Sequence, residues 1–210
     1  MYIIKIADSL DDFLKNLAQY PEGRVACEPW GVQFPCVEKP DTRFRLAHSD
    51  DAIFVHMRCT NDDVRSTVRE HYGPVNSDSC MEFYFAPGGD RSQYFNMEAN
   101  PAGFLRLKFG GTDRAGRVIP SFRFEELDLR MKADPAEGTW TLAYTLPYSL
   151  IRDMEPDFSG AEGTKIYGMF CKCGDLCREP HFFTSAPVDT AARSEPDFHA
   201  PEAFEEYLFE

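Results

Sequence analysis

The residues best suited to chemistry lie in the stretch 78–100, which reads DSCMEFYFAPGGDRSQYFNMEAN. Two runs of alternating polar and apolar side chains flank a turn-forming Pro-Gly-Gly segment, and this pattern predicts a β-hairpin with one buried face. A third strand is predicted over residues 104–109. Because side chains alternate along a strand, the three strands would share one polar face, made of Glu82, Asn96, Glu98, Arg106 and Lys108.

Such a face could hydrogen-bond a ligand with many hydroxyl groups. Carboxylates accept hydrogen bonds, ammonium and guanidinium groups donate them, and amides do both. A simpler interpretation is a solvated sheet face on which opposite charges pair across strands. Glu82 and Glu98 could also form the carboxylate pair of a glycosidase, although nothing in the sequence marks either as an acid with a raised pKa.

Cysteine and histidine side chains near the C-terminal end form a second group of candidate ligands. Cys171, Cys173 and Cys177 precede His181, which suggests zinc. The spacing lacks the Cys-x2-Cys pairs of common zinc sites, so ordinary buried thiols are favoured. His181 and His199 could each serve as a base or a ligand, but a partly buried structural histidine is the more common case.

The overall charge restricts the classes of partner. The formal net charge is -13 and the pI is near 4.8, and the basic residues do not cluster in the sequence. Both observations argue against a nucleic-acid partner, because binding to phosphates needs a basic patch. No phosphate-binding loop, nucleophile elbow or His-Glu-x-x-His helix is present.

Features of the chain that bear on its location favour the cytoplasm. No apolar run approaches the roughly 20 residues of a membrane span, and residues 1–18 lack the basic and apolar regions of a signal peptide. The odd number of cysteines, 7, also favours a reducing compartment. A periplasmic or secreted location is expected instead if a signal peptide has been removed.

The fold class follows from many short strand patterns separated by turn signals. Residues 139–146 alternate most clearly, and other strands are expected over 2–6, 42–47, 52–59, 165–173 and 207–209. Short helices are expected over residues 10–17, 148–154 and 201–204. With 210 residues, the chain is predicted to form one domain, 1–210, an all-β antiparallel β-sandwich with a few short helices.

Five sequence blocks, in this order, resemble the family 9 carbohydrate-binding modules. They are DSCMEFYF (78–85), YFNMEAN (94–100), KCGD (172–175), PHFF (180–183) and PDFHAPEAF (196–204). The likeness covers about residues 30–210 and is strongest to stand-alone bacterial family 9-like proteins of the DOMON-type superfamily.

The resemblance implies an immunoglobulin-like or jelly-roll-like sandwich that binds sugars without catalysis. It further implies binding at saccharide chain ends, an association with polysaccharide catabolism, and calcium in a structural role. Glu82 falls at the position of a hydroxyl-contacting carboxylate, and Arg65 matches an arginine before the DSC block. We therefore expect saccharide contacts from Glu82, Arg65, Asn96 and Glu98, with Lys172 and His181 at the rim.

Two positions depart from the family pattern. Asn76 stands where the family offers a first tryptophan, and residues 185–187 replace the segment that carries a second one. Tryptophan rings provide the apolar surface on which a sugar ring stacks. Tyr72, Tyr167 and Phe183 are candidates to replace them, and Tyr72 and Asn76 are also expected among the ligand-binding residues. Asp78 and Asp175 are alternatively expected to anchor turns by accepting backbone hydrogen bonds.

Three other functions remain open at this stage. One is a glycoside-processing enzyme that uses Glu82 and Glu98. Another is an interaction module that has lost sugar binding, for which the missing tryptophans are the support. The third is haem binding, which the DOMON-type resemblance implies, with ligands drawn from His56, His181, Met57 and Met97. The sequence predicts no oligomeric state.

Overall fold

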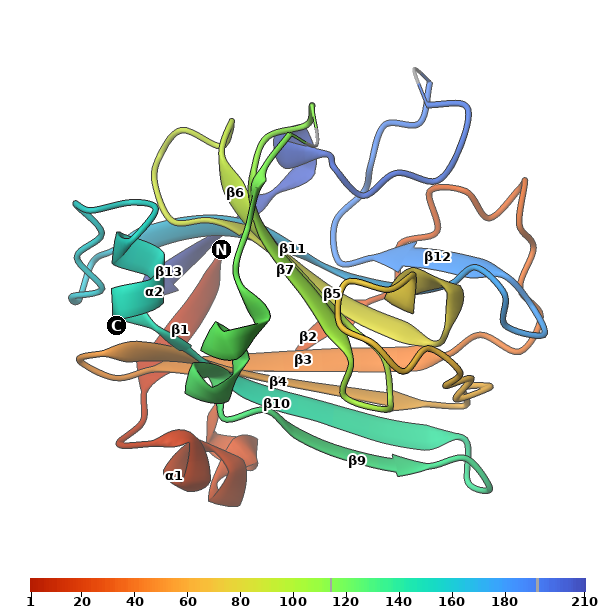
Figure 1. The fold of residues 1–210 in the computed structure, drawn as a ribbon, viewed down its shortest axis with the longest axis horizontal. Helices are drawn as coiled ribbons and strands as arrows, with labels where there is room; N and C mark the ends of the chain where they lie inside the picture. Colours follow the sequence, from red (N-terminus) through yellow and green to blue (C-terminus); the bar gives the residue numbers. More distant parts are fainter. Residues whose placement is uncertain (114, 192) are drawn as a thin grey trace.

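The computed structural model describes residues 1–113, 115–191 and 193–210, and most of its regular secondary structure is strand (Figure 1). The strands are β1 Tyr2–Ile6, β2 Gly23–Val25, β3 Asp41–His48, β4 Ala52–Thr60, β5 Cys80–Ala86, β6 Tyr94–Ala99, β7 Leu105–Gly110, β8 Arg117–Val118, β9 Arg130–Asp134, β10 Thr139–Pro147, β11 Lys165–Gly174, β12 His181–Thr184 and β13 Glu205–Phe209. The helices are α1 Leu10–Lys15 and α2 Tyr148–Arg152, with 3-10 turns η1 Leu17–Gln19, η2 Val75–Ser77, η3 Ser121–Leu127 and η4 Pro201–Ala203. None of the described helices is long and apolar enough to cross a membrane.

The strands form one continuous curled sheet of mixed direction. Its order is β8-β7-β6-β5-β11-β13-β1-β3-β4-β10-β9, with β12 paired to β11 and β2 to β3. The predicted all-β class is confirmed, but the prediction of a purely antiparallel arrangement is wrong at β1. That strand runs parallel to both of its neighbours, β13 and β3. Parallel neighbours need a long crossover connection, and the chain between β1 and β3, which carries α1, supplies it.

The two halves of the curled sheet share one hydrophobic core. Phe44 of β3 stacks on Phe170 of β11 with ring centroids 3.9 Å apart, and Phe83 of β5 stacks on the same ring at 4.1 Å. These side chains, together with Trp140 and Tyr207, are at most 3% exposed. Full burial of each such aromatic side chain contributes roughly 1.5–3 kcal/mol. This core fixes which face of β5 and β11 points inward.

The predicted hairpin is present as β5 and β6, with β7 beside β6. Met81 pairs with Ala99, Phe83 with Met97 and Phe85 with Phe95, and the alternation buries these side chains in the shared core. The opposite face is also covered, because the chain after β12 packs over it and forms a second apolar cluster. The side chain of Glu82 is only 2% exposed. The interpretation of this surface as a solvated sheet face is therefore wrong.

One buried aspartate organises the strand-free segment 61–72. Both carboxylate oxygens of Asp78 accept hydrogen bonds, from the backbone N–H groups of Thr67 and Val68 at 2.8 Å, from Thr67 Oγ1 at 2.8 Å and from Asn100 Nδ2 at 3.0 Å. Arg65 Nε lies 3.4 Å from Asp78 Oδ1. Although burial opposes ionisation, these hydrogen bonds hold the pKa of Asp78 below its usual value. The expected anchoring role of Asp78 is confirmed.

Candidate functional site: a buried polar cavity over β5, β6, β7 and β11

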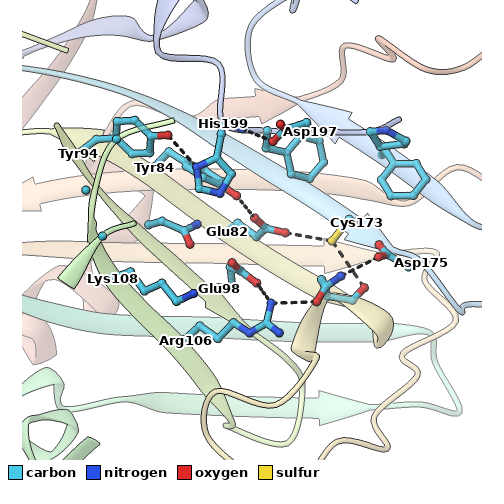
Figure 2. A pocket seen from close by; sticks show the side chains of 18 residues that line it. Glu82, Tyr84, Tyr94, Glu98, Arg106, Lys108, Cys173, Asp175, Asp197 and His199 are labelled. Atoms are coloured by element: carbon cyan, nitrogen blue, oxygen red, sulfur yellow. Dashed lines mark hydrogen bonds and ion pairs between the residues drawn. The ribbon is translucent and has the colours of Figure 1, made fainter. Parts of the chain in front are cut away.

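A cavity of about 210 Å³ opens on the polar face of the hairpin (Figure 2). Its floor comes from β5, β6, β7 and β11, and the C-terminal segment 196–199 forms one wall. Its lining residues are Asn76, Glu82, Tyr84, Tyr94, Asn96, Glu98, Arg106, Lys108, Gly110, Gly111, Gly116, Cys173, Asp175, Phe182, Pro196, Asp197, Phe198 and His199.

The strand register places the polar side chains of the floor in two rows. One row runs from Glu82 through Glu98 to Arg106, since each pairs with the next across the sheet. A second row joins Tyr84, Asn96 and Lys108 in the same way. Directly paired residues point to the same face of a sheet. The five polar residues predicted to share one face therefore do so.

Hydrogen bonds fix both oxygens of the Glu82 carboxyl group. Tyr84 OH donates to Oε2 at 2.8 Å, and the Cys173 thiol donates to Oε1 at 3.0 Å. Burial, and next the charge of Glu98, raise the pKa of Glu82 to about 8. Each carboxyl oxygen has two lone pairs, so both can still accept a bond from a ligand hydroxyl.

Glu98 lies beside a guanidinium group. Arg106 Nη1 is 3.3 Å from Glu98 Oε2 and also donates to Asn76 Oδ1 at 3.1 Å. Burial raises the pKa of Glu98, and the charge of Arg106 offsets part of that rise. Asp175 completes this side of the cavity, where Asn76 Nδ2 donates to its Oδ2 at 2.7 Å.

Asn96 offers the cavity a hydrogen-bond donor. Its side chain is 3% exposed, and Nδ2 has no hydrogen-bond partner within the described part of the chain. A buried amide N–H without a partner costs about 1–3 kcal/mol. An oxygen atom of a ligand in the cavity would satisfy it.

Aromatic rings form the wall on the other side of the cavity. Figure 2 shows Tyr84, Tyr94 and His199 facing Glu98, Arg106 and Lys108 across the space around Glu82. Tyr94 OH and His199 Nδ1 are 2.7 Å apart. Phe182 and Phe198 complete the wall. The spacing of polar residues could not predict this wall, although Phe198 and His199 belong to the PDFHAPEAF block that resembles the family.

The structure brings half of the predicted site residues to the cavity. Asn76, Glu82, Asn96 and Glu98 line it, whereas the other four lie elsewhere. Arg65 is held at Asp78. Tyr72 packs against the shared core, and its hydroxyl donates to the carbonyl groups of Leu107 and Ile119.

Lys172 does not lie at the rim but is completely buried on the opposite face of β11. The face is opposite because Lys172 alternates with Cys171 and Cys173, and Cys173 lines the cavity. Its ammonium group lies 3.5 Å from Asp62 Oδ1 and donates to His181 Nε2 at 2.7 Å. His181 Nδ1 in turn donates to the Glu179 carbonyl at 2.8 Å, so the ring is a neutral part of the interior.

The side chains proposed to replace the two tryptophans also lie away from the cavity. Phe183 points into the shared core, and Tyr167 lies under the guanidinium of Arg91, 4.1 Å from the ring centroid. The aromatic wall of this cavity is instead made of tyrosine, phenylalanine and histidine.

The metal and haem ligand sets suggested by the sequence do not assemble. Cys173 faces the cavity, whereas Cys177 lies near Gly174 and His181 on another side of the strand. Met57 and Met97 are packed in the shared core. His56 alternates with Met57 along β4 and so points away from that core.

Calcium has no evident side-chain site in this part of the chain. The described residues contain one group of three potential ligands, Cys80, Glu82 and Cys173. Calcium prefers six to eight oxygen ligands, so this set does not suit it. The calcium that the resemblance implies stays a prediction.

Comparisons with known proteins agree with this architecture. The model of carbohydrate-binding family 9 matches residues 14–209. No curated protein matches the chain. A candidate carbohydrate-binding protein from Bacteroides uniformis shares 25% identity and superposes with a TM-score of 0.84, covering 100% of this chain and 98% of that one.

More distant structures share the fold. A family 9 carbohydrate-binding module from Caldicellulosiruptor kristjanssonii, solved with glucose, shows a TM-score of 0.68 at 12% identity, with coverage of 100% of this chain and 95% of that chain. The same kind of module solved with cellotriose shows 0.66 at 11% identity, with coverage of 100% and 93%. Because the family model spans nearly the whole chain, this protein belongs to carbohydrate-binding family 9.

Proposed function

We propose that the chain binds a saccharide in the cavity over β5, β6, β7 and β11 and does not cleave it. The observation that carries the proposal is the buried, unpartnered Nδ2 of Asn96, which lies in the same cavity as Glu82 and Glu98. A sugar hydroxyl both donates and accepts, so it can satisfy the Asn96 donor and the carboxyl acceptors together.

The size of the cavity favours the end of a saccharide chain. Its volume of about 210 Å³ is below the roughly 300–1,000 Å³ of pockets for drug-sized ligands. Phe182 and Phe198 line it and are available as apolar contacts for a terminal sugar ring. The relatives solved with glucose and cellotriose support a ligand of this class. The association with polysaccharide catabolism stays a prediction that rests on the family resemblance.

Isothermal titration with mono- and oligosaccharides tests the proposal. Each sugar is used in its free form and with its end reduced to the alditol, with calcium and with a chelator. Saturable binding that is lost on end reduction supports recognition of the reducing end. If no sugar binds to protein that melts cooperatively, the proposal fails, and an interaction module without sugar binding becomes the better account.

One observation favours the enzymatic alternative. Glu82 has a raised pKa and lies directly opposite a second carboxylate, Glu98, as glycosidase acids do. Its oxygens also accept hydrogen bonds from Tyr84 and Cys173, and these contacts hold the carboxyl group in one orientation. Turnover of a chromogenic glycoside that is abolished in both Glu82→Gln and Glu98→Gln would overturn the non-catalytic assignment.

A further inference from the structure

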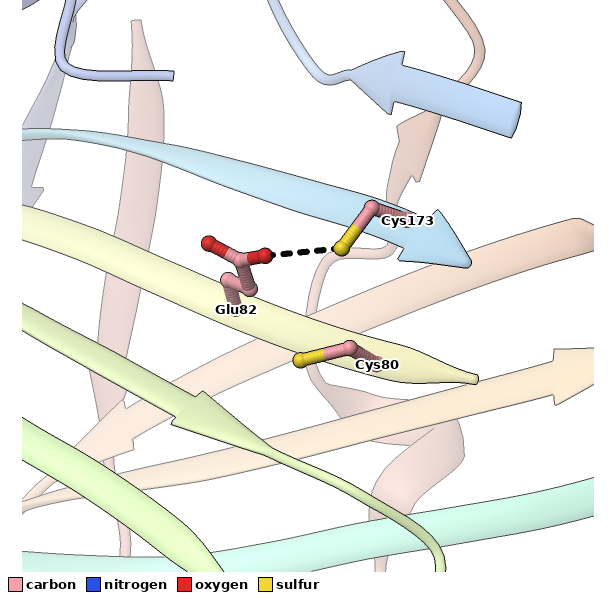
Figure 3. Close-up of side chains that lie close together, drawn as sticks. All are labelled: Cys80, Glu82 and Cys173. Carbon is pink, nitrogen blue, oxygen red and sulfur yellow. Dashed lines mark hydrogen bonds between the residues drawn. The ribbon is translucent and has the colours of Figure 1, made fainter. Parts of the chain in front are cut away.

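Two thiols and one carboxyl group lie close together beside the cavity, and two of these side chains, Glu82 and Cys173, line it (Figure 3). Cys80 and Cys173 are directly paired across β5 and β11, and Glu82 follows Cys80 by two residues on the same face. The two sulfur atoms and one Glu82 oxygen all lie within 4.8 Å of one another. Cys173 Sγ is 3.0 Å from Glu82 Oε1.

We propose that Cys80, Glu82 and Cys173 bind one zinc ion. Thiolate sulfur and carboxylate oxygen are both zinc ligands, with bond lengths of about 2.3 Å and about 2.0–2.2 Å. At those bond lengths, tetrahedral ligand atoms stand roughly 3.5–4 Å apart, a separation that small side-chain rotations can reach here. Sulfur ligands select against calcium and magnesium, which prefer oxygen.

The three side chains are held in place before any metal binds. Cys80, Glu82 and Cys173 are 0%, 2% and 2% exposed, and they project from two paired central strands. Tyr84 OH donates to the other Glu82 oxygen at 2.8 Å and so orients the carboxyl group. Partners of this kind orient metal ligands in known sites.

The fourth coordination position of the ion would face the cavity. Cys173 and Glu82 line the cavity, and Asp175 lies at the same edge. Three protein ligands with one open position are typical of zinc sites that exchange a water molecule or an exogenous ligand. The open side also provides the route by which the ion would enter.

The metal-free protein keeps the cluster neutral through its own protons. The Cys173 thiol donates to Glu82, and burial raises the pKa of Cys80 to about 12. Zinc would displace these protons, because only thiolates and carboxylates act as its ligands. The site differs from the one suggested by sequence spacing, in which Cys171, Cys177 and His181 were the partners of Cys173. It also does not depend on saccharide binding, although Glu82 belongs to both.

A direct metal titration tests the proposal. The reduced protein is stripped with a chelator, dialysed and titrated with zinc in competition with a chromogenic chelator, and cobalt is added separately to reveal sulfur-to-metal charge-transfer absorption. We expect one zinc ion per chain. Cys80→Ser and Cys173→Ser should each weaken binding by at least roughly 100-fold and remove the absorption, since loss of a neighbour of a ligand alone costs about 10–100-fold.

Two further variants make the result decisive. Cys177→Ser alters a buried thiol outside the cluster and should bind zinc as the unmodified protein does. Glu82→Gln keeps both thiols and nearly the same volume, and should also weaken binding, which guards against a folding defect in the serine variants. The proposal would be overturned if the unmodified protein did not bind zinc. It would also be overturned if folded Cys80→Ser and Cys173→Ser bound zinc as tightly as the unmodified protein.

Discussion

Glu82 and Glu98 lie directly opposite each other on β5 and β6, yet their carboxyl groups have different partners. Arg106 lies 3.3 Å from Glu98, whereas Tyr84 and Cys173 donate to Glu82. The pKa of Glu82 is raised to about 8, first by burial and then by Glu98. A neutral carboxyl group and a carboxyl group beside a guanidinium are thus available to one ligand.

The raised pKa of Glu82 predicts a loss of stability as pH rises. Between the usual carboxyl pKa and about 8, the folded state holds a proton at Glu82 that the unfolded state has released. The contribution of Glu82 to the free energy of unfolding is therefore fully present at low pH and falls as pH rises through this window. Above the window this contribution no longer changes with pH. Glu82→Gln cannot titrate. We expect the stability of the unmodified protein to fall by a few kcal/mol relative to Glu82→Gln between pH 5 and pH 8.5.

Urea unfolding of both proteins at several pH values measures this difference. Titrating groups far from this site change both proteins alike, so the difference reports Glu82 together with Glu98, the carboxyl group whose charge acts on it. A difference that is independent of pH would show that Glu82 titrates normally in the folded protein.

Asn96→Ala is expected to weaken saccharide binding without lowering stability. Its Nδ2 has no partner in the described residues, so the substitution removes a desolvated donor rather than an internal hydrogen bond. The bond it would make to a ligand contributes about 1 kcal/mol, so binding should weaken about fivefold to tenfold.

The matched control is Gln93→Ala, an exposed amide just before β6. Calorimetric titration with the best sugar, and thermal melting without sugar, provide the two readouts. If Asn96→Ala bound the sugar as tightly as the unmodified protein, Asn96 would not contact the saccharide.

Lys172→Met is expected to destabilise the fold by about 3–5 kcal/mol. Both Lys172 and Asp62 are buried, and their charged groups lie 3.5 Å apart. Burial opposes ionisation of Asp62, but Lys172 and hydrogen bonds from Ser79 and Trp140 lower its pKa to about 2. Removing the ammonium group would leave that carboxylate uncompensated.

The double variant Lys172→Met with Asp62→Asn should recover part of the loss, because no buried charge remains. Denaturant unfolding of the two single variants and the double variant gives the coupling energy. Saccharide affinity should not change, since neither residue lines the cavity. If Lys172→Met changed the saccharide affinity without changing the stability of the fold, Lys172 would belong to the binding site.

Asp78→Asn is expected to cost about 1–3 kcal/mol for each donor left without an acceptor. The carboxylate accepts from two backbone N–H groups and two side chains, and an amide offers only one oxygen. Since the folded pKa of Asp78 is lowered, its contribution is present above the usual carboxyl pKa and is lost as pH falls.

The destabilisation should therefore be large at pH 7 and shrink towards pH 3 in urea unfolding. Arg65→Ala should act in the same direction but more weakly, because the guanidinium is partly exposed and lies 3.4 Å from Asp78. Loss of sugar affinity in a fully stable Arg65→Ala variant would contradict a purely structural role for this arginine.

Local pattern was enough to predict the hairpin and its polar face. Alternation along residues 80–86 and 94–99 buries Phe83 and Met97 and places Glu82, Asn96 and Glu98 on the other side, and the two strands pair across the connection 87–93. The order of the sequence blocks likewise indicated family 9, which the family model confirms.

Contacts between segments far apart in the chain decided the rest. Whether Glu82 faces bulk water or a walled cavity depends on the segment 196–199, which lies more than one hundred residues away. The pairing of β11 with β5 sets Cys173 beside Cys80 and Glu82, and the segment after β4 brings Asp62 to Lys172. A strand's alternation identifies two faces but not which one is covered, because burial is a property of what packs against it.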